Sequence, residues 1–453
     1  MLNRTHHIGV IGLTQSGKTT FLTSLLDHWN NHHPKKFPLG RTPQKHSLMI
    51  QWNGEDEDSG RRLFEQNRAS IASGEWVSKS LALETYSLSL NCSSWHLAQP
   101  IKLYDIPGER LADAEMLRHK CLSHWSEAIV HTIEVDPSLS DHAADFLRAY
   151  RGTTSATESS LSRLEKAYRR LMAKFLRSRI PLITPSSMLV DSDGNYVPDD
   201  SMTSIEKLEK WFTEQCPMGI SGKPIVPVPK CFKDKKSEMW LRCQSHYNEY
   251  RRMVVRPALE PLGACHDIVF LVDIAGIFAQ GASWKNQAST LIERFVGGVA
   301  PGSWTEKWWK KSLHYGALGL VAPQVDRIVF VATQTDRIHR DDRSKVKQLL
   351  EDLARPAVRY PASKGYLEVH YCVAAAVEST ESHPMHELRY LNQDESEPSK
   401  ATISELPDEF PNGWKRGDYR FPRTAPRMPE NKGNPPKQFG LDAITEILFA
   451  IKK

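Results

Sequence analysis

The chain has 453 residues, of which 40% are hydrophobic and 25% are charged. This composition is that of an ordinary globular protein, and it excludes wholesale disorder and fibrous structure. At about 150 residues per domain, the length allows roughly three domains. Lysine and arginine outnumber aspartate and glutamate by 59 to 54, and the net charge of +5 is too close to neutral to indicate nucleic-acid binding.

The seven cysteines are scattered along the chain and form no CxxC motif. We therefore expect reduced thiols in the cytoplasm, and neither a disulfide framework nor a zinc ribbon. The apolar run near the N-terminus is too short for a signal peptide, and no apolar run approaches the ~18 to 20 residues of a membrane span. We expect the chain itself to be soluble.

Short apolar runs rich in β-branched residues recur along the chain, which is typical of the buried strands of a parallel sheet covered by helices on both faces. These runs are residues 8–12, 101–105, 128–136, 267–275, 327–333 and 367–375. Residues 83–92 alternate between apolar and polar and predict a half-exposed edge strand. The pattern predicts an α/β fold with a mostly parallel sheet.

Long amphipathic helical patterns replace the strands between residues 138 and 264, most clearly at 158–180 and 235–262. This change predicts an inserted all-helical domain at 138–264. The remainder, residues 1–137 and 265–453, then forms one α/β domain.

Two further segments are expected to be additions to the α/β domain. Residues 278–323 form an insertion that carries Trp304, Trp308 and Trp309 among lysines, for which packing against the core is favoured over contact with a membrane or a partner. Residues 392–440 are rich in proline, glycine and charged residues and predict a long surface excursion. The apolar spacing of 439–451 predicts a terminal helix that docks on the core.

A complete GxxxxGK[ST] motif runs from Gly12 to Thr19, directly after the first predicted strand and directly before a predicted helix. In such a loop the backbone amides curl around phosphates, the lysine reaches the β and γ phosphates and the hydroxyl after it binds Mg²⁺. We expect the phosphates to be bound by Gly12, Gln15, Ser16, Gly17, Lys18, Thr19 and Thr20. Lys18 is also a candidate catalytic residue, and Thr19 a metal ligand.

A DxxG sequence, Asp105 to Gly108, ends the predicted strand 101–105. At this position in a nucleotide hydrolase the aspartate holds Mg²⁺ through water, and the glycine N–H contacts the γ phosphate. Glu109 stands where Ras-like enzymes keep a glutamine that orients the attacking water. It is a candidate catalytic residue, with a solvated residue at a helix start as the alternative.

The sequence Thr333-Gln334-Thr335-Asp336 follows the predicted strand 327–333 and is similar to the [NT]KxD motif with which GTPases bind guanine. The Asp336 carboxylate would accept hydrogen bonds from guanine N1–H and the exocyclic amine, a donor pair that adenine lacks. Thr333 and Gln334 complete this segment. A backbone N–H near the end of the next strand would contact guanine O6, with Ala375 as the expected residue.

A serine or threonine before the strand 83–92 should complete the Mg²⁺ and γ-phosphate contacts from switch I. Ser80 is our first choice for this metal ligand, and Thr85 is the alternative.

Taken together, these motifs resemble the YcjX-like family of bacterial, stress-associated P-loop GTPases. The resemblance spans nearly the whole chain, including GLTQSGKTTFLTSLL, YDIPGERLADAEML, YNEYRRMVVRPALEPLGACHDIVFLVDIAG and VDRIVFVATQTDRIHRDD. It implies a Ras-like G domain with an inserted helical domain. Two positions depart from the family pattern: Gln334 replaces a lysine, and Arg110 stands where the family often has tryptophan.

The motifs and the resemblance together predict a GTPase that binds GTP with Mg²⁺, hydrolyses it slowly and acts as a stress-associated nucleotide switch. A homodimer or another partner would supply an arginine to speed hydrolysis. The resemblance also implies a membrane-associated partner, which would bring a cytoplasmic protein to the inner membrane. The alternatives are a non-catalytic nucleotide-binding scaffold and an ATP-dependent NTPase.

Overall fold

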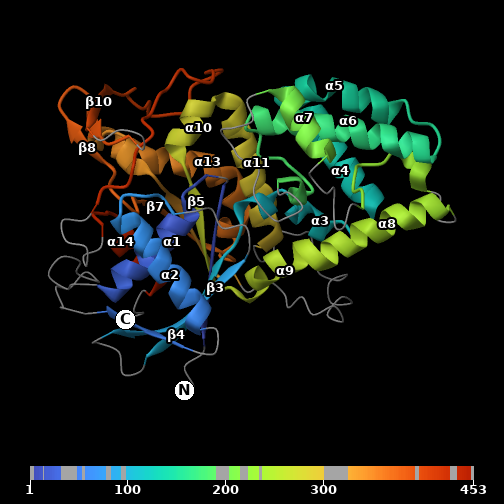
Figure 1. The fold of residues 1–453 in the computed structure, drawn as a ribbon. Coiled ribbons are helices and arrows are strands. Elements are labelled where there is room, and N and C mark those ends of the chain that lie inside the picture. The colour runs from blue at the N-terminus through green and yellow to red at the C-terminus, as the bar shows by residue number, and fades with distance from the viewer. Residues whose placement is uncertain are drawn as a thin grey trace. The chain divides into compact units, whose positions relative to one another are not determined.

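The computed structural model describes residues 5–13, 15–31, 48–53, 57–77, 83–92, 98–189, 204–214, 223–233, 237–299, 325–392, 397–428 and 436–449. The chain divides into two compact units, the first made of Met1–Gly108 and Glu260–Lys453 and the second of Glu109–Leu259 (Figure 1). The Trp304, Trp308 and Trp309 cluster lies outside the described residues.

The first unit is built on a seven-stranded sheet with the strand order β2-β3-β4-β1-β5-β6-β7. All neighbouring strands are parallel except that β3 runs antiparallel to both β2 and β4. The strands are β1 (His6–Gly12), β2 (Leu48–Trp52), β3 (Glu84–Cys92), β4 (Gln99–Asp105), β5 (Asp267–Val272), β6 (Arg327–Ala332) and β7 (Glu368–Val373). The predicted α/β fold with a mostly parallel sheet is confirmed.

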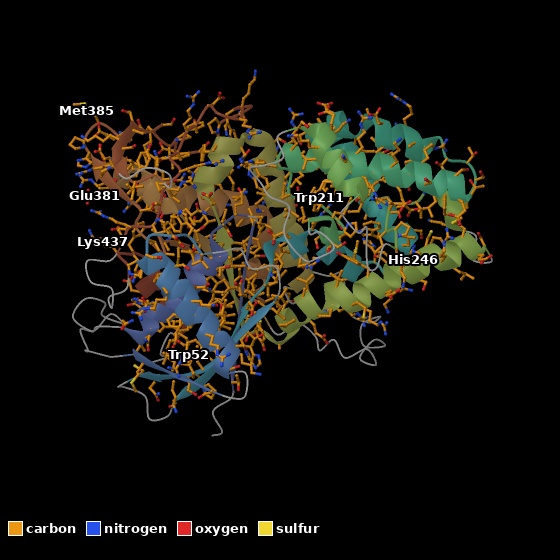
Figure 2. The ribbon with its side chains drawn as sticks, in the orientation of Figure 1. Trp52, Trp211, His246, Glu381, Met385 and Lys437 are labelled. Carbon is orange, nitrogen blue, oxygen red and sulfur yellow. The ribbon has the colours of Figure 1, made fainter. Side chains whose placement is uncertain are left out.

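Helices of the first unit pack on both faces of this sheet. They are α1 (Lys18–Asn30), α2 (Glu57–Ala72), α10 (Ile274–Gln280), α11 (Ala282–Val299), α13 (Arg343–Ser363) and α14 (Leu441–Leu448). A small antiparallel sheet has the order β10-β9-β8, with β8 (Thr380–His383), β9 (Glu387–Tyr390) and β10 (Ser399–Thr402). Met385, in the turn between β8 and β9, is 89% exposed and stands at the margin of the unit (Figure 2).

The core of the first unit is formed where α1, α2 and α14 cover one face of the sheet. The indole of Trp29 in α1 is fully buried there and donates to the Thr445 hydroxyl of α14 at 2.9 Å. On strand β5, Phe270 instead packs against Phe295 of α11, with ring centroids 5.2 Å apart. The predicted terminal helix therefore does dock on the core, through the buried side chains of Leu441, Ile444 and Leu448.

The predicted strand at 128–136 is wrong, because this segment is part of helix α4 (Leu122–Val135). Trp125, Ile129 and Ile133 are all buried, and their spacing of four residues places them on one helical face. The β-branched residues of this run have a high strand propensity, but burial of the apolar stripe on one helical face outweighs that propensity.

One other expectation about the first unit is corrected. The alternating segment 83–92 is a strand, but β2 pairs with its outer side, so β3 is not at the edge of the sheet. The described part of 392–440 is largely irregular and exposed, as a surface excursion predicts, but buried residues such as Leu406 and Trp414 attach it to the first unit. The Trp414 indole donates to the Phe278 carbonyl at 3.0 Å, which anchors this coil on α10.

The described residues of the second unit form helices joined by irregular segments, with no strand among them, and the unit begins at Glu109, earlier along the chain than the expected boundary at 138. Its helices are α3 (Ala114–Arg118), α4, α5 (Pro137–Arg151), α6 (Glu158–Arg177), α7 (Ile205–Glu214), α8 (Glu238–Tyr250) and α9 (Arg256–Leu259). A π-helical turn, Arg251–Val255, joins α8 to α9. None of the described helices is both long and apolar enough to cross a bilayer.

A buried carboxylate, that of Asp113, organises the polar interior of the second unit. It accepts hydrogen bonds from the hydroxyls of Thr184, Ser186 and Tyr250 at 2.7, 2.5 and 2.8 Å, and from the Ser186 amide at 3.0 Å. Burying a charge is tolerated when donors surround it in this way. Through these hydrogen bonds, Asp113 links its own segment, which follows Gly108, to the loop at residues 184–186 and to Tyr250 at the end of α8.

We expect Asp113→Asn to destabilise the second unit by about 3 kcal/mol, because the amide group turns a donor toward hydroxyls that now donate. Hydrogen exchange at Thr184–Ser187, followed during urea unfolding, measures this loss. Asp141→Asn, at an exposed position on α5, is the control and should leave the exchange unchanged. Equal protection in both variants would contradict the prediction.

Candidate functional site

The loop between β1 and α1 joins the end of a strand to the start of a helix, which is where a phosphate-binding loop is expected. Strand β1 ends at Gly12 and helix α1 begins at Lys18, so the helix N-terminus and its unpaired amides face the loop. Gly17 precedes the helix with φ of 72°, a left-handed conformation that glycine adopts without strain. The Ser16 amide donates to the Leu13 carbonyl at 3.0 Å, which closes the loop into a turn.

Lys18 and Thr19, the first two residues of α1, meet the carboxylate that ends β4. The Lys18 Nζ lies 2.8 Å from Asp105 Oδ1, and the Thr19 hydroxyl donates to Asp105 Oδ2 at 3.4 Å. Asp105 is fully buried. Strands β1 and β4 are neighbours in the sheet, and this adjacency brings the two motifs together.

This hydroxyl and carboxylate are a donor set suited to Mg²⁺. The ion prefers oxygen ligands and usually keeps several waters, so one or two protein oxygens are enough. The predicted metal ligands Thr19 and Asp105 therefore lie together. Ser80, the third, lies outside the described residues.

The alternative to Ser80, Thr85, lies inside strand β3 and pairs with Tyr104 in the sheet register. Its backbone belongs to the sheet, which leaves no loop there to close over a ligand. The residue before it, Glu84, is opposite Asp105 in the same register. Burial and the charge of Asp105 raise the pKa of Glu84. No sequence motif singles out Glu84, because its place beside Asp105 depends on strand pairing.

Gly108 lies against the backbone of the phosphate-binding loop. A Cβ atom at this position would fall 2.4 Å from the Gly12 carbonyl oxygen, so only glycine fits. The DxxG segment therefore ends in contact with the loop, as the predicted role of Gly108 requires. Gly108 is also the last residue of the first unit before the chain enters the second.

Glu109 and Arg110 begin the second unit, in a short 3₁₀ helix, Gly108–Leu111. Glu109 is bonded directly to Gly108 along the chain. The Arg110 guanidinium donates to the Ser186 hydroxyl at 2.5 Å and to the Tyr250 hydroxyl at 3.4 Å, both within the second unit. Arg110 is thus held by the Asp113 network instead of pointing into solvent.

The TQTD segment after β6 supports the phosphate-binding loop through two side chains. The Thr333 hydroxyl donates to the Ser16 carbonyl at 2.8 Å, and the Gln334 Nε2 donates to the Gln15 carbonyl at 2.7 Å. Gln334 has a left-handed backbone, with φ of 54°. The segment therefore touches the loop although more than 300 residues separate the two in the sequence.

Asp336 is only 3% exposed and is oriented by two residues that the sequence analysis missed. Its Oδ2 accepts hydrogen bonds from the Ser379 amide at 2.9 Å and from the Ser379 hydroxyl, and its carbonyl accepts from the Thr380 hydroxyl at 2.5 Å. Burial raises the pKa of Asp336, and the Ser379 hydrogen bonds oppose this effect. The signal that could have found Ser379 is a serine and a threonine shortly after the strand next to β6.

The backbone amide of Ala375 does not take the position predicted for it. It donates to the Phe439 carbonyl at 3.0 Å, and the Phe439 amide donates back at 3.1 Å, which forms an isolated bridge just before α14. The amide expected to contact guanine O6 is therefore already hydrogen-bonded within the protein. Docking of the C-terminal helix, which a local motif cannot reveal, causes this difference.

A group of possible metal ligands lies elsewhere in the first unit, at Asp342, His386 and Glu405, whose ligand atoms are within 4.8 Å of one another. The Lys345 ammonium is 3.0 Å from both carboxylates and already supplies a positive charge. We assign no metal site there.

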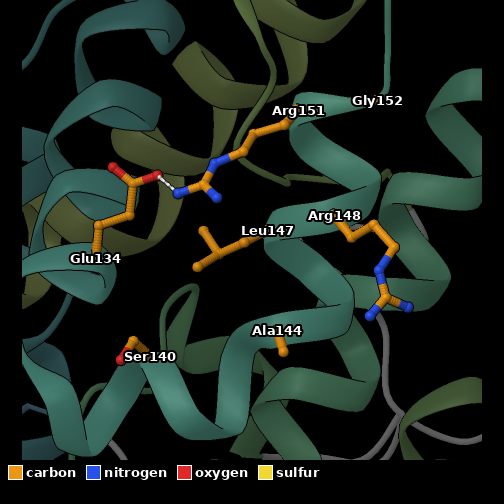
Figure 3. Close-up of a pocket in the computed structure, with 7 residues that line it drawn as sticks. All are labelled: Glu134, Ser140, Ala144, Leu147, Arg148, Arg151 and Gly152. Atoms are coloured by element: carbon orange, nitrogen blue, oxygen red, sulfur yellow. Dashed lines mark hydrogen bonds and ion pairs between the residues drawn. The ribbon is translucent and has the colours of Figure 1, made fainter.

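The second unit has an open groove of about 760 Å³ on the surface of α4 and α5 (Figure 3). It is lined by Glu134, Ser140, Ala144, Leu147, Arg148, Arg151 and Gly152. Glu134 and Arg151 form an ion pair at 2.6 Å, and Arg148 lies 3.6 Å from Asp145. These exposed pairs are weak and satisfy the charges locally, so the groove offers no converging group for a ligand.

The fold and the site define the class of protein: a P-loop protein with a Ras-like fold, in which motifs at the ends of β4 and β6 flank the loop. The sequence model of the YcjX-like family, DUF463, matches residues 7–452, and the chain belongs to this family.

Two curated relatives align with almost the whole chain. One is the Ras-like GTPase YcjX of Shewanella oneidensis (strain MR-1), 22% identical over 485 residues, with 96% of this chain and 91% of the relative covered. The other is the Ras-like GTPase YcjX of Escherichia coli (strain K12), 20% identical over 482 residues, with 100% and 96% covered.

We expect Lys18→Met to destabilise the nucleotide-free protein by about 3 kcal/mol, because it leaves the buried Asp105 carboxylate without its counter-charge. Chemical denaturation measures the effect. Lys347→Met, at an exposed position on α13, is the control. The double variant Lys18→Met/Asp105→Asn should regain most of the lost free energy of unfolding. A loss in the double variant equal to the sum of the losses in the two single variants would contradict the pairing.

Proposed function

We propose that this protein binds GTP with Mg²⁺, hydrolyses it slowly and acts as a nucleotide-dependent switch. The observation that carries the proposal is the meeting of Lys18 and Thr19 with Asp105, which unites the phosphate-binding loop with the DxxG segment. Membership of the YcjX-like family and the names of both relatives support the same class of activity.

The phosphates would be held by the amides of the loop and the first turn of α1. Lys18 would leave Asp105 and turn to the β and γ phosphates, where its charge is useful as negative charge develops on the transferring group. Thr19 and Asp105 would hold Mg²⁺, which neutralises phosphate charge when bound. The amide of Gly108, a residue too close to the Gly12 carbonyl to carry a Cβ atom, would contact the γ phosphate.

Glu109 would orient the attacking water or accept its proton, since it follows Gly108 directly. Hydrolysis would be slow because Arg110, the arginine next to it, is held by Ser186 and Tyr250 and is not available for the phosphates. A second protein, or a second copy of this chain, would then supply the missing positive charge.

We expect Glu109→Ala to lower the single-turnover rate of GTP hydrolysis by about a hundredfold with little change in GTP affinity. Lys18→Ala should weaken GTP binding and reduce phosphate release to background. Glu158→Ala, at a site where the side chain is 69% exposed, serves as the control and should hydrolyse GTP at the wild-type rate. Equal phosphate release from the wild type and Lys18→Ala would favour a non-catalytic nucleotide-binding scaffold.

The choice of guanine would rest on Asp336, whose carboxylate is fixed by Ser379. We expect Asp336→Asn to lower GTP affinity by about a hundredfold and to raise affinity for xanthosine triphosphate, because the amide can keep its oxygen on Ser379 and turn its NH₂ toward the C2 carbonyl of xanthine. Fluorescent-nucleotide titration measures both.

The exposed neighbour substitution Asp341→Asn, where the side chain is 65% exposed, is the matched control. Unchanged GTP affinity in Asp336→Asn, or tighter binding of ATP than of GTP by the wild type, would overturn the role given to Asp336.

As a switch, the protein would pass the state of the nucleotide from Gly108 to Glu109, because these residues share a peptide bond and belong to different units. The Asp113 network would carry a displacement of this segment into the second unit. A stress-associated role and a membrane-associated partner enter the proposal through the family resemblance. The seven cysteines are scattered and form no CxxC motif, which supports a cytoplasmic location.

A further inference from the structure

Gln334 stands where the family pattern has lysine, and its amide is held at both ends. The Nε2 donates to the Gln15 carbonyl of the phosphate-binding loop at 2.7 Å, and the Oε1 accepts from the Arg337 Nη1 at 2.8 Å. A side-chain amide has one donor end and one acceptor end, so only this orientation satisfies both partners. Without a donor at Oε1, the amide could turn and present its oxygen to the Gln15 carbonyl, which would repel it.

Arg337 is itself fixed in place from two further directions. Its Nε donates to the Pro422 carbonyl at 3.0 Å, and its Nη1 lies 3.5 Å from Asp273 Oδ2. The side chain is 18% exposed. Asp273 in turn caps helix α10 by accepting from the Gly276 amide at 2.8 Å. The guanidinium therefore has little freedom, and its charge stays beside Gln334.

A lysine at position 334 would combine three tasks in one side chain: a donor to the loop carbonyl, an aliphatic stem beside the base and a positive charge near the phosphates. Gln334 has the donor and the stem but no charge. Arg337 has the charge, one turn further along the same segment, and it contacts the acceptor end of Gln334.

We propose that Arg337 is a positioning residue of the nucleotide site, which fixes the amide of Gln334 against the phosphate-binding loop and supplies the charge that a lysine would bring. The inference rests on the proposed function. It assigns to two residues of this chain the work that one lysine does in the family pattern.

The test is a pair of substitutions in the full-length protein, read out as the affinity and dissociation rate of fluorescent GDP and GTP. Arg337→Met should weaken binding by about tenfold, mostly through faster dissociation, as expected for the loss of one charge-assisted hydrogen bond. Gln334→Lys should bind as tightly as the wild type or more tightly. In the Gln334→Lys background, Arg337→Met should cost less than about twofold, because the lysine no longer needs Arg337.

Two controls separate this role from a structural one. Arg340→Met removes a nearby arginine that is 65% exposed and should leave both rates unchanged. Gln334→Glu keeps a partner for Arg337 but cannot donate to the Gln15 carbonyl, so it should weaken binding by about tenfold in a protein that still melts at the wild-type temperature. This second variant tests the link even if Arg337→Met fails to fold.

An equal loss of affinity for Arg337→Met in both backgrounds would overturn the inference, since the effect would then act through Pro422 or Asp273. Wild-type affinity in Gln334→Glu would overturn it as well. Failure of the wild-type protein to bind guanine nucleotides is a different result, because it would refute the proposed function itself.

Discussion

The carboxylate of Asp105 is fully buried, and a buried charge is stable only where an opposite charge and hydrogen-bond donors meet it. Lys18 and Thr19 meet it from the first turn of α1. For this to happen β1 and β4 must be neighbours, α1 must begin at Lys18, and the loop must bend at Gly17. The sheet order, the loop conformation and the start of the helix are thus tied to one electrostatic requirement.

The opposite side of the loop is held by neutral hydrogen bonds from the TQTD segment. Thr333 and Gln334 each donate to a carbonyl of the loop, while Asp336 is turned toward Ser379. The coil near the C-terminus completes this arrangement, since the Thr424 hydroxyl lies 2.7 Å from that of Ser379. These contacts join segments from the start, the middle and the end of the chain, so long-range packing within the first unit shapes the site.

The second unit depends on a different buried carboxylate, that of Asp113, which sits only five residues after Gly108 along the chain. Its donors come from the loop around Ser186 and from Tyr250 at the end of α8. The segment that leaves the DxxG motif is therefore part of the interior of the helical unit. Because the DxxG segment is proposed to contact the γ phosphate, this connection gives the second unit its place in the proposed switch.

The sequence by itself determined the features that local chemistry fixes. GxxxxGKT between an apolar strand and a helix has one common structural meaning, and the α/β fold, Lys18, Thr19 and Asp105 all followed from such motifs. Tertiary structure decided the rest, because the same residues have more than one stable local conformation. The run 128–136 is helical because Ile129 and Ile133 are buried on one face of α4. The Ala375 amide is paired with Phe439 because the segment just before α14 lies beside the end of β7. Ser379 and Glu84 reach the site only through contacts between segments that are distant in the sequence, and the free energy of these contacts depends on packing that no short motif encodes.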